Sequence, residues 1–199
     1  MAAEQTRSKS RRAAILEAAQ TCFFQYGLER TRMEDIARLA HISRPALYEH
    51  FENKSAIFLA LARSIITSQL QEAEVELQHS GPIWKRVISA FEAWSVKPLE
   101  MIAAAPHADD IIQAGSGLAA DVYREGRKNF CKRLSAALQD ATRKGELNLK
   151  KAGLTATAAA DLLVTASTGA KSDWKDTTLY RKRITGFIHV FAAATSPEE

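Results

Sequence analysis

The chain has few of the features that mark secreted or membrane proteins. It contains two cysteines, Cys22 and Cys131, which lie far apart without a paired spacing, so we interpret both as small core residues in a reducing compartment. A redox-sensing thiol is the alternative interpretation. No run of about 18 apolar residues occurs, and the basic start of the chain lacks an apolar stretch, so we expect neither a membrane span nor a signal peptide. These absences predict a cytoplasmic protein.

Motifs of enzymes and metal sites are also missing. The five histidines are scattered and form no HExxH pattern, there is no CxxC pair, and no GxGxxG, GxxxxGK[ST] or GxSxG sequence occurs. His107 with Asp109 and Asp110 is the one cluster of possible ligands, and we do not expect it to bind a metal. The sequence therefore predicts no metal, no cofactor and no enzymatic activity; an enzyme would need a convergent acid-base or metal constellation.

What is present is a pattern of helices. Hydrophobic residues make up 46% and charged residues 25% of the chain, as in soluble globular proteins. At 199 residues the chain can bury a core without disulfide or metal support. Apolar residues recur with helical spacing, and no strand or internal repeat is evident. We predict an all-α protein with a flexible arm over residues 1–12, a three-helix domain over 13–54 and a helical bundle over 55–199.

The net charge of +4 is weakly informative, but its distribution is uneven. Residues 1–12 hold four basic side chains against one acidic side chain. Such an arm can track phosphates or reach into a minor groove, and it is as often a solvated tail. The composition alone favours neither interpretation.

The stretch from Thr31 to Lys54 carries most of the functional information. Thr31 with Glu34 forms a T-x-x-E pattern, which predicts an N-terminal capping box. The next cap candidate is Ser43, with Pro45 in the first turn of the following helix, where its missing N–H costs nothing. Two short helices joined by a tight turn are therefore expected.

The second of these helices has a divided surface. Leu47 and Phe51 are four residues apart and face inward together. The outward side chains are then those of Arg44, Ala46, Tyr48 and His50. A guanidinium can bond a guanine edge, a small residue can lie against a thymine methyl, and a phenol and an imidazole can donate to phosphate. An ordinary helical hairpin with a solvated face is the alternative.

These residues also resemble a known family. The segments ILEAAQTCFFQYG, TRMEDIARLAHIS and RPALYEHFENKSAI, within residues 9 to 60, resemble the DNA-binding domain of TetR-family transcriptional regulators. His41 departs from the pattern, because the family usually has glycine in this turn. We expect positive φ at this position, which histidine tolerates better than most residues. Together, chemistry and resemblance predict DNA contacts by Thr31, Arg32, Ser43, Arg44, Pro45, Ala46, Tyr48, His50 and Lys54.

The remainder of the chain is expected to form a ligand-binding and dimerisation domain. A long helix should run from Lys54 to a break at His79–Pro82, followed by an amphipathic helix that Pro98 kinks or ends, and by four further helical segments. Aromatic residues of this part are usually core, but the resemblance implies an effector pocket. The candidate lining residues are Trp84, Phe91, Trp94, Met101, Tyr123 and Phe130.

The last two helices are rich in small and apolar residues. Composition alone favours a core inside one subunit, whereas the resemblance implies a homodimer formed through these helices, with Leu162, Leu163, Ala166, Phe187 and Phe191 in the interface. We therefore expect a ligand-responsive repressor that binds a palindromic operator on double-stranded DNA as a homodimer and is released by a small apolar or amphipathic effector. The alternative is a helical ligand-binding or protein-interaction module that does not bind DNA.

Overall fold

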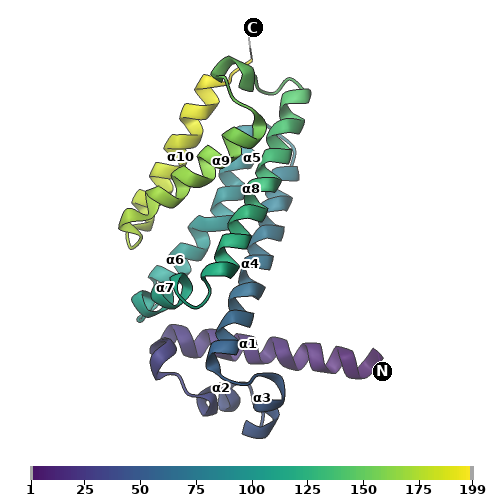
Figure 1. Cartoon of the computed structure of the whole chain (residues 1–199), viewed down its shortest axis with the longest axis vertical. Helices are drawn as coiled ribbons and strands as arrows, with labels where there is room; N and C mark the ends of the chain where they lie inside the picture. The colour runs from purple at the N-terminus through teal and green to yellow at the C-terminus, as the bar shows by residue number, and fades with distance from the viewer. Residues whose placement is uncertain (1, 198–199) are drawn as a thin grey trace. The chain divides into compact units, whose positions relative to one another are not determined.

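The computed structural model describes residues 2–197, and within them every regular element is helical, which confirms the all-α prediction (Figure 1). Short π and 3-10 segments lie between some of the α-helices. The elements in chain order are α1 (Ala2–Arg30), α2 (Met33–Leu39), α3 (Arg44–His50), α4 (Lys54–Gln78), α5 (Ile83–Phe91), η1 (Glu92–Val96), α6 (Lys97–Ala103), α7 (Ala108–Ser116), α8 (Ala120–Arg143), η2 (Leu149–Ala152), α9 (Ala156–Gly169), η3 (Ala170–Asp173) and α10 (Thr177–Ala194).

The chain divides into two packed units. The head unit comprises residues 1–65 with 104–123, and the body unit comprises residues 66–103 with 124–199. This division differs from the expected boundary at residue 54. The first turns of α4 belong to the head because Ile57 and Phe58 are buried in its core, and helix α7 also packs on α1.

The core of the head unit joins all of its first four helices. Ile15 of α1, Ile36 of α2, Leu47 of α3 and Ile57 of α4 are each 0% exposed. Phe23 meets Phe58 edge to face with 5.7 Å between ring centroids. This shared apolar core holds the short helices α2 and α3, each of which is too short to be stable alone.

Helix α1 differs from the prediction at its N-terminal end. It begins at Ala2, so residues 2–12, which were expected to form a flexible arm, are helical in the structure. Gly27 interrupts the helix, with φ 78° and ψ 163°. One further helical turn follows, up to Arg30, before α2 begins.

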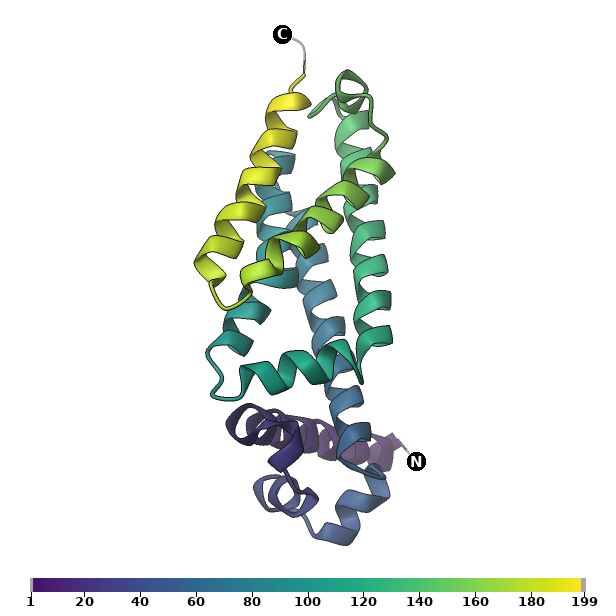
Figure 2. The same cartoon turned by 60° about the vertical axis from the view of Figure 1, so that its left-hand side comes forward.

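The body unit is built around aromatic contacts. Phe130 of α8 is 0% exposed, and its ring stacks on Trp94 with 5.1 Å between ring centroids. Phe91 meets the Phe130 ring edge to face. Gly126 permits this packing, because a Cβ there would lie 2.6 Å from Ile66 and 3.1 Å from Trp94. Figures 1 and 2 show α9 and α10 as neighbouring helices joined through η3.

Pro98 acts through the residues before it. Helix α5 does not kink at Pro98 but passes into the π-helical segment η1, and Pro98 is then the second residue of α6. A proline has no N–H for the carbonyl four residues earlier and its ring crowds that carbonyl, so a wider turn at this point relieves the conflict. The predicted interruption is thus confirmed, one turn earlier than expected.

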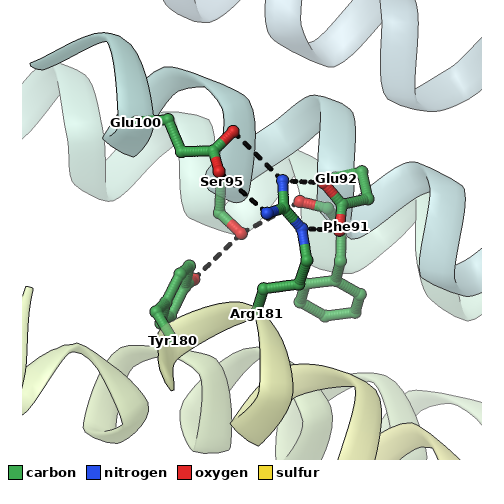
Figure 3. A network of polar contacts seen from close by, with 6 residues as sticks. All are labelled: Phe91, Glu92, Ser95, Glu100, Tyr180 and Arg181. Atoms are coloured by element: carbon green, nitrogen blue, oxygen red, sulfur yellow. Dashed lines mark hydrogen bonds and ion pairs between the residues drawn. The ribbon is translucent and has the colours of Figure 1, made fainter. Parts of the chain in front are cut away.

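A polar network fastens α10 to η1 and α6 within the body unit (Figure 3). The buried hydroxyl of Tyr180 donates to Ser95 Oγ over 2.9 Å, and Ser95 donates to the Phe91 carbonyl. The Arg181 guanidinium pairs with Glu92 at 2.8 Å and with Glu100 at 2.8 Å, and hydrogen bonds to these carboxylates raise the pKa of Arg181. The network fixes the rotation of α10, and therefore which of its side chains face outward.

None of the helices formed by the described residues has an apolar stretch sufficient to cross a lipid bilayer.

Candidate nucleic-acid interface

The start of α2 is capped one residue later than predicted. The N-cap is Arg32, and its backbone N–H donates to the carboxylate of Asp35 over 3.3 Å. Thr31 is 2% exposed, and its hydroxyl donates to the Gly27 carbonyl over 2.7 Å, with the Cys22 carbonyl 3.2 Å away. Thr31 therefore joins the end of α1 to the start of α2. Its assignment as the N-cap was wrong, because the N-cap is Arg32. Its role as a DNA contact stays a prediction.

The turn between α2 and α3 contains the expected strain. His41 has φ 54°, and it is the one non-glycine residue with positive φ among the described residues. The Ile42 N–H donates to the Ala37 carbonyl over 3.0 Å, which closes the turn. A left-handed conformation costs an L-residue about 1–2 kcal/mol. The turn keeps its geometry with histidine in place of glycine, as the sequence suggested.

Helix α3 begins as predicted. The Ser43 hydroxyl accepts from the Ala46 N–H over 3.3 Å, and Pro45 lies in the first turn. Leu47 and Phe51 face the core, with exposed fractions of 0% and 5%. The Arg12 guanidinium of α1 lies over the Phe51 ring, 4.2 Å from its centroid, a contact that the sequence did not suggest. The outward face of α3 is thus set by its cap and its buried pair.

The outward face carries the predicted chemistry. Arg44 and Tyr48 are exposed, and Ala46 and His50 are half-buried. The guanidinium of Arg44 lies 5.6 Å from the centroid of the Tyr48 ring. It also forms an ion pair with Glu34 of α2, with 2.8 Å between Nη1 and Oε1. A hydrogen bond to Tyr48 and, next, the charge of Glu34 raise the pKa of Arg44, so it is a permanent cation.

Lys54 has a structural task that the sequence did not reveal. Its Nζ donates to the carbonyls of Leu28 and Glu29, over 2.8 Å and 2.7 Å. These are carbonyls of the last turn of α1, where a cation is also favoured by the helix dipole. An ammonium has three donors, so one is left for a phosphate. Lys54 is therefore first a cap that ties α4 to α1.

We expect Lys54→Met to lower the free energy of unfolding of the head unit by about 1–2 kcal/mol, because two carbonyls lose a charged donor. Urea unfolding can resolve this change, since Trp84, Trp94 and Trp174 all lie in the body unit. Head unfolding should therefore change the circular dichroism before the tryptophan fluorescence. The exposed Lys128, changed to Met, is the control. Equal stability of the two variants, with a flatter salt dependence of DNA binding for Lys54→Met alone, would assign Lys54 to phosphate instead.

Gly27 and helix α7 form a close contact inside the head unit. A Cβ at Gly27 would overlap the carboxylate of Asp110 and would lie 3.4 Å from the His107 side chain. Asp110 lies in the first turn of α7, and His107 is the residue just before this helix. The cluster that the sequence offered as possible metal ligands therefore packs against α1. No group of three or more acidic, histidine or cysteine side chains suited to a metal occurs among the described residues.

Comparison with known proteins fits this geometry. Residues 15–61 match the family model described as bacterial regulatory proteins of the tetR family. The match covers α2, the turn and α3 together with the second half of α1 and the first turns of α4. This part of the chain is therefore similar to the DNA-binding domain of the TetR family.

Curated relatives resemble the N-terminal part of the chain. The probable regulator ArpR of Pseudomonas putida is 38% identical over 85 residues, which are 40% of this chain and 40% of ArpR. The regulator TtgR of Pseudomonas putida is 36% identical over 85 residues, again 40% of both chains. The matched part thus spans about 40% of the length of these relatives.

Solved structures extend the likeness in fold to the body unit. SmeT, the repressor of the Stenotrophomonas maltophilia multidrug efflux pump SmeDEF, is 22% identical with a TM-score of 0.67 over 94% of this chain and 91% of that chain. A TetR-family regulator structure from Mesorhizobium loti is 18% identical with a TM-score of 0.71, over 96% and 98% of the two chains. The TM-scores and the coverage show that the whole chain shares the fold of these regulators.

The residues predicted to line a pocket do not all share one environment. Phe91 and Phe130 are fully buried and form the aromatic core with the half-buried Trp94. Met101 is 41% exposed, whereas Tyr123 belongs to the head unit and lies against Gly115. The remaining candidate, Trp84, packs against Phe191 with 6.3 Å between centroids. Their role as effector ligands stays a prediction.

The expected dimer residues separate into two groups. Leu163 is 2% exposed and packs inside its own body unit, so its assignment to an interface was wrong. Leu162 is 49% exposed and Phe187 40% exposed, and Ala166 and Phe191 are half-buried. Val190, which the sequence did not single out, is 67% exposed. Composition and the resemblance do not show which side of a helix packs inside its own subunit, so the buried Leu163 was grouped with the exposed Leu162.

Proposed function

We propose that the chain is a ligand-responsive DNA-binding transcriptional regulator, and specifically a repressor that binds a palindromic operator as a homodimer. The observation that carries the proposal is helix α3, whose N-terminal half is exposed while Leu47 and Phe51 anchor it in a core shared with α1, α2 and α4. A helix held this way can enter a major groove, where Arg44 can read a guanine edge and Ala46 a thymine methyl. The match of residues 15–61 to a family of bacterial regulatory proteins supports the same conclusion.

The direct test is a band-shift titration of operator DNA. We expect the complex with a two-fold symmetric duplex to remain bound at moderate salt. The complex with a scrambled duplex of equal length should dissociate under the same conditions. Binding that is equally strong on both duplexes and vanishes with salt is purely electrostatic, and it would contradict the proposal.

The homodimer is proposed to form through the outer faces of α9 and α10. Leu162, Phe187 and Val190 are exposed, and no atom lies within 4 Å of a Cβ placed at Gly169 or Gly186. Small residues beside exposed apolar ones suit the close approach of helices from a second copy. A two-fold dimer would also present two α3 helices to successive major grooves, roughly 34 Å apart.

We expect Val190→Glu to convert the dimer to a monomer, because two carboxylates would be buried near the two-fold axis without partners. Light scattering after size exclusion measures the mass. Val75→Glu is a matched control, since Val75 is also a helical valine with 55% exposure. A monomeric parent, or loss of the dimer in both variants, would contradict the assignment of this face.

A small apolar or amphipathic effector is proposed to bind the body unit and release DNA. One support is the likeness in fold to SmeT, for which a complex with triclosan is known. The other is the course of α4, a continuous helix that starts beside α3 in the head and ends in the body. A ligand that favours a displaced α4 would move α3 away from its groove. A change from 99:1 to 1:99 in occupancy needs affinities for the two states that differ about 10⁴-fold.

A further inference from the structure

Arg44, the strongest candidate for reading a base, is engaged in an ion pair within the head unit. Its guanidinium contacts Glu34 Oε1 at 2.8 Å, and the two side chains remain 60% and 49% exposed. Arg44 is the first residue of α3 and Glu34 lies in the first turn of α2. The pair therefore lies on the solvent side of the helix-turn-helix, and DNA would have to replace Glu34 as the partner of Arg44.

Glu34 has no part in capping α2. The sequence assigned it to a capping box, but Asp35 accepts the hydrogen bond from the Arg32 N–H and also pairs with Arg38 at 2.9 Å. Glu34 is exposed and its carboxylate is directed to another helix. An exposed ion pair contributes little to stability, with a median near 0–1 kcal/mol. Its placement beside the base-reading arginine therefore calls for a different explanation.

We propose that Glu34 is a specificity-determining residue, which competes with DNA for Arg44 and releases the guanidinium only to a guanine edge. This inference rests on the proposed DNA-binding function. A bidentate contact with guanine is worth about 1–3 kcal/mol, which exceeds the strength of an exposed ion pair. A lone phosphate offers Arg44 about the same interaction as Glu34 does, so at a non-cognate sequence the pair persists.

The consequence is a lower affinity for non-cognate DNA. While Arg44 stays with Glu34, the protein makes one fewer phosphate contact in each protomer, and the carboxylate itself repels the DNA backbone. At a cognate site the guanidinium leaves Glu34 and the bidentate bond more than compensates. Glu34 thus widens the ratio of cognate to non-cognate affinity without touching a base.

The test is a double-mutant cycle with Glu34→Gln and Arg44→Ala in the full-length protein. The probes are a duplex selected from a random pool and a scrambled duplex of the same length and composition. We expect Glu34→Gln to raise affinity for the scrambled duplex about threefold to tenfold and to steepen its salt dependence by about 0.9 per protomer, because Arg44 gains a phosphate. Affinity for the selected duplex should rise less, so the specificity ratio falls.

The second arm isolates Arg44. In the Arg44→Ala background, Glu34→Gln should leave the salt slope unchanged and alter affinity no more than Glu52→Gln, which removes another exposed carboxylate of the head unit. An equal effect of Glu34→Gln with and without Arg44 would overturn the proposal and leave a simple charge effect. Weaker binding of the selected duplex by Glu34→Gln would also overturn it, because Glu34 would then position Arg44 for reading. If the parent selects no DNA at all, the regulator proposal fails as well.

Discussion

Gly27→Ala is expected to destabilise the head unit more than any other single methyl addition to the described glycines with positive φ. The backbone at Gly27 has φ 78° and ψ 163°, a combination that only glycine adopts readily. The added Cβ would also overlap the Asp110 carboxylate. Backbone strain of about 1–3 kcal/mol and overlap of a similar size should together remove roughly 2–6 kcal/mol of stability.

Two further variants separate these causes. Gly153→Ala is the matched control, because Gly153 also has positive φ, at 67°, but no atom lies within 4 Å of its Cβ position. It should lose only about 1 kcal/mol. Adding Asp110→Ala to Gly27→Ala should restore the part of the stability that was lost to the overlap with the Asp110 carboxylate. Urea unfolding followed by circular dichroism measures all three variants. Equal losses at Gly27 and Gly153 would show that α7 yields and that the contact is not close.

Arg44→Ala is expected to remove discrimination at one base position of each half-site. A bidentate contact contributes about 1–3 kcal/mol, so binding to the selected operator should weaken by roughly tenfold or more for each half-site. Affinity for duplexes altered at that base pair should hardly change. Titration of a panel of duplexes, each with one substituted base pair, measures this pattern.

Arg32→Ala is the control for Arg44→Ala. Arg32 is an exposed arginine of the same head unit, predicted to contact DNA, and it caps α2 through its backbone. As a phosphate contact its loss should weaken all duplexes alike and flatten the salt slope by about one unit per half-site. The same uniform pattern for Arg44→Ala would make Arg44 a phosphate contact, and α3 would then read sequence through other side chains.

Local patterns in the sequence were sufficient to predict much of the head unit's helix capping and turn geometry. Ser43 caps α3, as the sequence predicted, and the start of α4 has a similar local cap, in which Asn53 Oδ1 accepts from the Ala56 N–H over 2.9 Å. Positive φ at His41 was also foreseen. Each of these features depends on residues within about four positions, where backbone sterics and capping dominate.

Features that depend on distant partners were missed. Thr31 matched a cap pattern, but it is buried and its hydroxyl also lies 3.2 Å from the carbonyl of Cys22, nine residues earlier. Lys54 matched a phosphate contact but binds carbonyls more than twenty residues away. The Arg44 pair with Glu34 was hidden for the same reason. When a side chain has a plausible local role, the sequence does not reveal that a residue elsewhere in the fold competes for it.

The body unit illustrates a different limit. Its helices and their breaks were close to those predicted, but which faces point outward was not. Leu163 is buried beside the exposed Leu162, and Val190 is more exposed than Phe187. The orientation of α10 depends on the contacts of Tyr180 and Arg181 with η1 and α6, which no periodicity in α10 contains.

Selection of duplexes from a random pool by the full-length protein tests the central claim most directly, because it assumes neither an operator nor an effector. The proposed function predicts enrichment of two-fold symmetric sequences whose half-site centres lie about one helical turn, 10–10.5 base pairs, or a multiple of it apart. The parent protein should enrich a guanine at one position of each half-site, and the Arg44→Ala variant should show no preference for a base at that position. Recovery of a pool without shared sequence, after washing at moderate salt, would contradict the claim that α3 reads DNA.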